Sequence, residues 1–264
     1  MTRRLCAIGL FAGAFAAGSP GAAQQTAASS TPSSGTPTQP SAEEIARRRQ
    51  VQEERLHNDW PFLQRYHEEN AKLLPPVKNE NRVVFFGNSI TEGWAPYFST
   101  MFPGRPYIGR GIGGQTTPQM LVRFRQDVID LKPKVVVILA GTNDIAGNTG
   151  PSTLEMIEEN LASMAELARA NGIRPVLSSV LPVYDYPWKP GLEPAPKIIA
   201  LNKWMKDYAR SHGAVYLDYH SAMADERGGM RAGLASDGVH PNEAGYRLMA
   251  PLAERAIEQA LRSK

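Results

Sequence analysis

The sequence contains a single cysteine, Cys6, and this scarcity excludes several kinds of chemistry. Cys6 lies in an N-terminal segment that we expect to be removed, so the mature chain would hold no thiol. A disulfide, a thiolate nucleophile and a cysteine-based zinc site are then excluded. The five histidines also lack the His-Glu-x-x-His spacing that places two imidazoles on one face of a helix. The sequence therefore disfavours metal catalysis by that route, and we expect no metal site.

A marked excess of charge is also absent. The chain has 29 basic and 26 acidic residues, a net charge of +3. Loss of residues 1–23, which include Arg3 and Arg4 but no acid, leaves 27 minus 26, or +1. A nearly neutral protein has no electrostatic reason to bind nucleic acid or an anionic membrane. We therefore expect no nucleic-acid partner.

The apolar run from Leu5 to Ala17 is too short to span a membrane comfortably. Arg3 and Arg4 precede it, and small residues ending at Ala23 follow it. A basic start, a short apolar stretch and a small-residue exit are typical of a cleavable secretory signal. We predict a signal peptide over residues 1–23, a periplasmic or secreted mature protein, and no stable membrane insertion. An uncleaved anchor or a buried helix is the alternative.

The rest of the chain divides by composition. Residues 24–40 contain no large apolar side chain and are expected to form a disordered linker. Residues 41–76 are charged and helix-prone, with Ser41 and Glu44 spaced as a capping box and Pro61 dividing the segment. We expect this helical extension to pack on the core without a part in catalysis. Residues 77–264 are enough for one domain of ordinary size.

Short runs rich in Val, Ile, Leu and Phe alternate with amphipathic stretches beyond Pro76. Strands buried on both faces show such runs without clean alternation. The pattern predicts strands at 82–87, 105–108, 134–140, 173–180 and 214–217, and helices at about 116–130, 152–171, 196–212 and 242–262. This order indicates the α/β class, as a three-layer α/β/α sandwich with a five-stranded parallel sheet. Ligands of such sheets bind beyond the carboxyl ends of the strands.

Two polar groups near those ends are candidates for nucleophilic catalysis. Ser89 follows the first strand directly, although a lone serine there is more often a turn or helix-capping residue and needs a base to act as a nucleophile. Asp237 and His240 lie three residues apart before the last helix. An acid so placed can accept the Nδ1–H of the histidine and leave Nε2 free to take a proton from serine.

Gly109, Gly111 and Gly114 satisfy the pattern Gly-x-Gly-x-x-Gly, which also occurs in dinucleotide sites. That motif normally follows the first strand, and no acid stands at the tip of the next strand to hold a ribose. A bare glycine N–H aimed at an anion is the alternative use. Asn143, after the third strand, either forms a turn with Asp144 or donates its amide to a developing oxyanion.

Taken together, the blocks GNSIT, GGQTT, GTND and DGVHPN resemble the SGNH/GDSL family of serine esterases in order and position. The resemblance covers about residues 82–252 and implies a flavodoxin-like sheet. It implies that Ser89 is the nucleophile and that His240 is the base assisted by Asp237. The oxyanion hole is then formed by the N–H groups of Ser89 and Gly114 and the amide of Asn143.

Asn88 departs from the family pattern, which usually has aspartate before the serine. Asparagine keeps the shape and hydrogen-bonding capacity of aspartate but removes a negative charge beside the nucleophile. We interpret it as the mark of a subgroup.

The resemblance implies acyl transfer from an ester to water without a cofactor. Secreted members suggest deacetylation of carbohydrate, so the expected substrate is a small-molecule or oligosaccharide ester. Trp94, Tyr184 and Trp188 are candidates for a flat wall against a sugar ring, although aromatic residues in such loops also serve packing. The alternatives are a lysophospholipase or short-chain lipid or aryl esterase, a non-catalytic glycan-binding module and a nicotinamide-dependent oxidoreductase.

Overall fold

The computed structural model describes residues 41–262. The predicted signal peptide and linker lie outside the described residues. The chain divides into two units, Met1–Ile45 and Ala46–Lys264. In the first, residues 41–45 are described and begin helix α1 (Ala42–Asn58), where Ser41 Oγ accepts the N–H of Glu44 at 3.1 Å. Helix α2 (His67–Lys72) lies beyond Pro61, so helices stand on both sides of that proline, as the sequence predicts.

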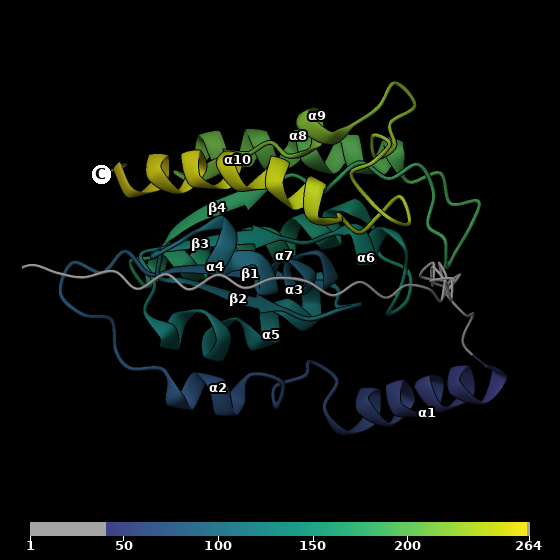
Figure 1. The fold of residues 1–264 in the computed structure, drawn as a ribbon, viewed down its shortest axis with the longest axis horizontal. Coiled ribbons are helices and arrows are strands. Elements are labelled where there is room, and N and C mark those ends of the chain that lie inside the picture. The colour runs from purple at the N-terminus through teal and green to yellow at the C-terminus, as the bar shows by residue number, and fades with distance from the viewer. Residues whose placement is uncertain (1–40, 263–264) are drawn as a thin grey trace, which may run out of the picture. The chain divides into compact units, whose positions relative to one another are not determined.

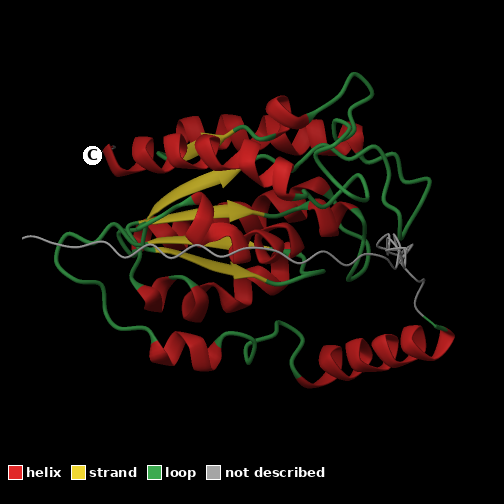
Figure 2. Ribbon diagram, viewed as in Figure 1, coloured by secondary structure: helices red, strands yellow, loops and turns green. Residues whose placement is uncertain are grey.

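A five-stranded parallel sheet forms the centre of the second unit (Figure 2). The strands are β1 (Val83–Gly87), β2 (Tyr107–Gly111), β3 (Val135–Leu139), β4 (Arg174–Ser178) and β5 (Val215–Leu217), in the order β2-β1-β3-β4-β5. All neighbouring strands pair in parallel. The chain leaves β1 toward β2 and then crosses to β3, which opens a crevice at the carboxyl ends of β1 and β3. The predicted α/β/α fold is confirmed.

Strand β2 begins two residues later than predicted and includes Gly109 and Gly111. These glycines pair in register with Phe85 and Gly87 of β1. A Cβ at Gly111 would collide with the backbone nitrogen of Glu92, so the strand there needs glycine to approach helix α3 (Ser89–Trp94). The first two glycines of the Gly-x-Gly-x-x-Gly pattern thus serve close packing at an edge strand.

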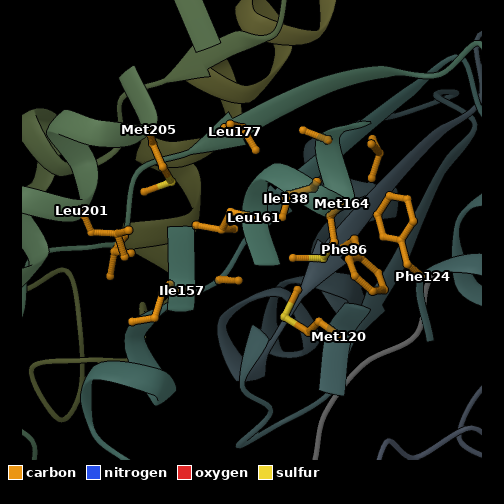
Figure 3. Close-up of a cluster of buried hydrophobic side chains, with 14 of the residues drawn as sticks. Phe86, Met120, Phe124, Ile138, Ile157, Leu161, Met164, Leu177, Leu201 and Met205 are labelled. Carbon is orange, nitrogen blue, oxygen red and sulfur yellow. The ribbon is translucent and has the colours of Figure 1, made fainter. Parts of the chain in front are cut away.

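One face of the sheet is covered by helices α5 (Thr117–Asp127), α7 (Leu154–Ala170) and α8 (Ala195–Ser211) (Figure 1). Figure 3 shows the cluster between them, including Phe86, Met120, Phe124, Ile138, Ile157, Leu161, Met164, Leu177, Leu201 and Met205. Burial of each such side chain contributes about 1.5–3 kcal/mol before entropy is counted. The even-numbered residues of β1 and β3 point to this face.

The opposite face is covered by α3, α4 (Phe98–Met101), α9 (His220–Met223) and α10 (Glu243–Arg262). Short elements complete the fold, namely η1 (Ala95–Tyr97), η2 (Ile129–Leu131) and α6 (Thr142–Ile145). Phe85 of β1 packs against an aromatic cluster on this face, with ring centroids 4.9 Å from Phe98 and 5.4 Å from Trp94. Among residues 41–262, no helix combines the length and apolar character needed to cross a lipid bilayer.

A fully buried ion pair joins the ends of β1 and β2 to the loop that follows them. Arg123 lies 2.9 Å from Asp127, and its guanidinium also donates to the carbonyls of Gly87 and Arg110 and to Oε1 of Gln115. Such a buried charge is tolerated because every donor direction has an acceptor. The result is that Gln115, in the loop before α5, has a fixed position beside the carboxyl ends of β1 and β2.

Candidate active site

Ser89, His240 and Asp237 form a continuous hydrogen-bonded chain. Ser89 Oγ lies 2.9 Å from His240 Nε2, although the two residues are 151 positions apart. His240 Nδ1 lies 2.7 Å from Asp237 Oδ2. Ser89 is the first residue of α3, directly after β1, and the other two lie in the loop before α10. The structure brings together the three side chains that the sequence predicts as nucleophile, base and orienting carboxylate, and their geometry fits those roles.

The carboxylate of Asp237 is held by its own loop. Its Oδ1 accepts the backbone N–H groups of Val239 at 3.0 Å and His240 at 2.7 Å. Partial burial acts to raise the pKa of Asp237, but the hydrogen bonds from the backbone and ring of His240 and from Val239 outweigh it, so the pKa is lowered. Asp237 is therefore anionic at neutral pH and requires a proton on Nδ1, which leaves Nε2 as the acceptor facing Ser89.

Contacts between α3 and α10 hold the serine and the histidine at this distance. The hydroxyl of Tyr246 on α10 donates to the carbonyl of Ile90 at 2.9 Å. The ring of Trp94 stacks on Tyr246 with centroids 5.5 Å apart. Trp94 is only 1% exposed, so its predicted place in a substrate wall is wrong. It lies on the inner face of α3, a helix the sequence analysis did not predict, and packs there as a core residue.

Asn88 caps the helix that carries the serine. Its side-chain oxygen accepts the N–H of Ile90 at 3.2 Å, and its carbonyl accepts the N–H of Glu92 at 2.9 Å. The residue is buried. An uncharged amide oxygen is sufficient for an N-cap, so the fold of this loop does not need the aspartate of the usual family pattern.

The loop after β2 passes beside Ser89. A Cβ placed on Gly113 would lie 3.8 Å from Ser89 Cβ, and the Gly113 N–H donates to Glu92 Oε2 at 2.8 Å. Gly114 has a φ of +76°, a left-handed conformation that favours glycine. The carboxylate of Glu92, one turn after Ser89, thus fixes the backbone at Gly113, the residue before the predicted oxyanion donor Gly114. Sequence reasoning missed Glu92 because its partner is distant in the chain.

Asn143 lies at the carboxyl end of β3, on α6, and is buried. Its Nδ2 donates to the Gln115 carbonyl at 2.8 Å, and its Oδ1 accepts from Asn148 Nδ2 at 3.0 Å. These partners fix the orientation of the amide and use one of its two N–H groups. The side chain of Asn143 is therefore bonded to the same loop whose Gly113 passes beside Ser89.

Trp188 extends this network to His240. Its indole N–H donates to Asn148 Oδ1 at 3.2 Å, and its ring centroid lies 6.0 Å from that of His240. The side chain is 44% exposed. The sequence does not indicate that Asn148 bonds to Asn143, because only the geometry of α6 brings the two side chains together.

Tyr184, also predicted to contact substrate, is 56% exposed. The guanidinium of Arg227 lies 4.1 Å from its ring centroid, so one face of the ring already has a partner in this chain. Its contact with substrate stays a prediction. Within residues 41–262, no group of three or more His, Cys, Asp or Glu side chains is arranged to hold a metal ion.

Asn143→Ala is expected to lower kcat on p-nitrophenyl acetate by about 10²–10³-fold, the usual loss for one oxyanion donor. KM should change little, because the donor acts on charge that develops in the transition state. Steady-state kinetics and thermal melting of the purified variant check this. A variant that melts like the wild type and keeps its kcat would remove Asn143 from the oxyanion hole.

The model of the GDSL-like lipase/acylhydrolase family matches residues 85–248. The structure of a GDSL-like lipase from Bacteroides thetaiotaomicron is 46% identical, with a TM-score of 0.74, over 76% of this chain and 100% of that one.

Two curated relatives are also similar. The uncharacterised lipoprotein YqeF of Bacillus subtilis is 35% identical over 120 residues, which are 39% of this chain and 49% of that protein. An acetylxylan esterase of Xylanibacter ruminicola is 25% identical over 228 residues, with 71% of this chain and 45% of that protein covered. The chain thus spans about half the length of these two relatives.

Proposed function

The chain belongs to the GDSL-like lipase/acylhydrolase family, and from this premise we propose that it is a serine ester hydrolase that deacetylates carbohydrate. The observation that carries the chemistry is the chain of hydrogen bonds from Ser89 Oγ through His240 to the Asp237 carboxylate. Family membership supports hydrolysis of an ester bond. The assignment of these three residues to its catalysis is our proposal.

The first stage forms an acyl-enzyme. His240 Nε2 takes the hydroxyl proton as Ser89 Oγ attacks the ester carbonyl, and Asp237 stabilises the imidazolium. The oxyanion receives hydrogen bonds from the N–H groups of Ser89 and Gly114 and from the free amide N–H of Asn143. His240 then gives its proton to the leaving alcohol as the tetrahedral intermediate collapses.

The second stage restores the enzyme. Water gives a proton to His240 as its oxygen attacks the acyl carbonyl on Ser89, and the same donors hold the second oxyanion. Collapse of this intermediate returns the proton to Ser89 Oγ and releases the carboxylic acid. The mechanism uses side chains, backbone N–H groups and water.

Two observations support an acetylated carbohydrate as substrate. An acetylxylan esterase is among the relatives. Trp188 presents a half-exposed ring next to His240, where the alcohol part of an ester would leave. Export to the periplasm or beyond is part of the proposal and is supported by the signal-like residues 1–23 and by a relative named as a lipoprotein.

The test is a panel of p-nitrophenyl esters together with acetylated xylo-oligosaccharides. We expect kcat/KM on the acetate to exceed that on the octanoate by about ten-fold or more, because poor fit of a few methylenes costs on the order of 1–3 kcal/mol. We also expect release of acetate from the oligosaccharides. A long-chain optimum would replace the proposal with a lipid esterase, and saccharide binding without turnover would favour a binding module.

A further inference from the structure

Asn148 lies three residues after α6 and contacts two parts of the proposed oxyanion hole. Its Nδ2 donates to Asn143 Oδ1 at 3.0 Å and lies 3.5 Å from the carbonyl oxygen of Gly114. Its backbone N–H donates to the backbone carbonyl of Asn143 at 3.0 Å. Asn148 is exposed and Asn143 is buried, so a surface residue holds the buried amide through its backbone as well as its side chain.

The direction of these side-chain hydrogen bonds is set by the groups at the two ends of the series. The indole N–H of Trp188 can only donate, and Asn148 Oδ1 accepts it at 3.2 Å. Asn148 therefore turns its amide oxygen to Trp188 and its amide nitrogen to Asn143. At the other end, the backbone carbonyl of Gln115 can only accept, and Asn143 Nδ2 donates to it at 2.8 Å. Together the two ends give each amide a single orientation.

The orientation of the Asn143 amide decides whether it can stabilise an oxyanion. With Nδ2 bonded to Gln115, its second N–H is available to the negative oxygen of the tetrahedral intermediate. A turn of the amide by 180° would present Oδ1 instead, an acceptor that repels an oxyanion. Asn148 opposes this turn, because its Nδ2 would then face Asn143 Nδ2, a donor against a donor.

The loop that carries Trp188 is itself attached to α6 and the residue after it. Lys189 Nζ donates to the carbonyl of Ala146 at 2.8 Å. The hydroxyl of the buried Tyr186 donates to the carbonyl of Thr142 at 3.0 Å, and the ring centroids of Tyr186 and Trp188 lie 5.0 Å apart. The indole N–H is therefore a fixed donor for Asn148, although its ring is half-exposed.

Water competes for these groups because Asn148 is exposed. If its side chain is removed, a water molecule can occupy the place beside Asn143 Oδ1. Water both donates and accepts, however, so it would satisfy either orientation of the Asn143 amide and oppose neither. The contribution of Asn148 is therefore one of orientation, and we expect it to be smaller than that of Asn143 itself.

We propose that Asn148 is a positioning residue of the oxyanion hole, which holds the Asn143 amide with one N–H toward the reacting carbonyl oxygen, and that the Trp188 indole fixes the orientation of Asn148. The proposal rests on the proposed function, because it takes Asn143 as an oxyanion donor. It concerns the rate of acyl transfer and does not depend on which alcohol the ester contains.

The test is a double-mutant cycle on p-nitrophenyl acetate hydrolysis by the full mature chain. Asn148→Ala is expected to lower kcat about three- to ten-fold, the range given by loss of one hydrogen bond between neutral groups, with KM unchanged. In an Asn143→Ala background, the same substitution should lower kcat by less than about two-fold, because the amide that it positions is gone. A side chain that only supports the fold would lower kcat by the same factor in both backgrounds.

Asn148→Asp separates orientation from packing. The carboxylate keeps the shape of the side chain and still accepts the indole N–H, but it presents an acceptor to Asn143 Oδ1. We expect kcat to fall by about ten- to thirty-fold, more than in Asn148→Ala, with a similar melting temperature. The added charge acts on the oxyanion in both backgrounds, so only the part of the loss that disappears in Asn143→Ala measures positioning.

Trp188→Phe removes the indole N–H and keeps an aromatic ring beside His240. We expect kcat to fall about two- to five-fold, with no further loss when this change is added to Asn148→Ala. Two matched controls make the same chemical changes elsewhere and should keep the wild-type kcat. Asn171→Ala removes an exposed amide at the end of α7, and Trp204→Phe removes an indole N–H on α8.

The outcomes separate this inference from the proposed function. Equal losses from Asn148→Ala in the wild-type and Asn143→Ala backgrounds overturn the inference alone, as does an unchanged kcat in Asn148→Ala or in Asn143→Ala. A wild type without Ser89-dependent hydrolysis overturns the proposed function and the inference with it. Melting temperatures of all variants establish that folded proteins are compared.

Discussion

Ser89→Ala is expected to lower kcat on p-nitrophenyl acetate by about 10⁵–10⁶-fold, the size of loss seen when the nucleophile of a hydrolytic triad is removed. The hydroxyl forms the covalent bond to the acyl group, so no neighbouring side chain replaces it. Folding should be nearly unaffected, because the helix is capped by Asn88 and alanine is a good helix former at its first turn. Initial rates and circular dichroism of the same preparation check both statements.

His240→Ala provides the control for that result. If serine and histidine act as one unit, the double variant with Ser89→Ala should lose no more activity than either single variant, since each alone abolishes the same step. Multiplicative losses would mean that the 2.9 Å contact between Ser89 and His240 is structural and that the two residues contribute separately. If Ser89→Ala keeps more than about 1% of the wild-type kcat, the nucleophile must be another group.

Residual activity in either single variant still carries information. The N–H groups of Ser89 and Gly114 and the amide of Asn143 do not depend on the serine hydroxyl, and an oxyanion hole alone accelerates attack by water about 10³–10⁴-fold over solution. The low remaining rate of Ser89→Ala should therefore fall further when Asn143→Ala is added. The two losses should be independent because the Asn143 side chain is held by hydrogen bonds to Gln115 and Asn148, which do not involve the Ser89 hydroxyl.

The strands, the position of Ser89 and the contact between Asp237 and His240 were predictable because their signals are local. Uninterrupted Val, Ile, Leu and Phe runs gave β1, β3 and β4 within one or two residues. Ser89 directly follows the first run, and Asp237 stands three residues before His240, where its loop alone brings the carboxylate to the ring. The pairing of Ser89 with His240, which lies 151 positions away, came instead from the resemblance of the four sequence blocks to the family.

What the sequence did not predict depends on short helices and distant contacts. Helices α3 and α6 have six and four residues, too few for a periodic pattern, and without α3 the inward direction of Trp94 could not be known. The bond from Asn148 to Asn143 follows from the shape of α6. The contacts of the N-terminal extension with Gly111 and Gln115 join residues 45 to 54 positions apart and have no local signature.

Asp237→Asn is expected to lower kcat by about 10⁴-fold while leaving the fold in place, as removal of the carboxylate does in other hydrolytic triads. The amide oxygen can still accept the backbone N–H groups that Asp237 Oδ1 accepts now. The amide nitrogen then faces Nδ1 and donates to it, which places the ring proton on Nε2. A protonated Nε2 cannot take the proton of Ser89, so the base is lost although the ring stays in position.

The effect of this change on stability has a defined sign. The pKa of Asp237 is lowered in the folded protein, so its charge contributes stability that is present above the ordinary carboxyl pKa and is lost as the pH falls through the folded value. The wild type should therefore be slightly more stable than Asp237→Asn at pH 7 and equal to it well below pH 4. The side chain is 39% exposed, so solvent screening keeps the difference small.

Kinetics, melting curves and a matched control decide the role of Asp237. Asp207→Asn makes the same chemical change on α8, where the carboxylate pairs with Lys203 at the surface, and should keep the wild-type kcat. If kcat falls by less than about ten-fold in Asp237→Asn, His240 reaches its reactive tautomer without the carboxylate. This result would contradict the triad, in which loss of the carboxylate lowers kcat by about 10⁴-fold. A large loss in kcat with an unchanged KM would instead show that Asp237 acts on the transition state through His240, because substrate binding would be intact.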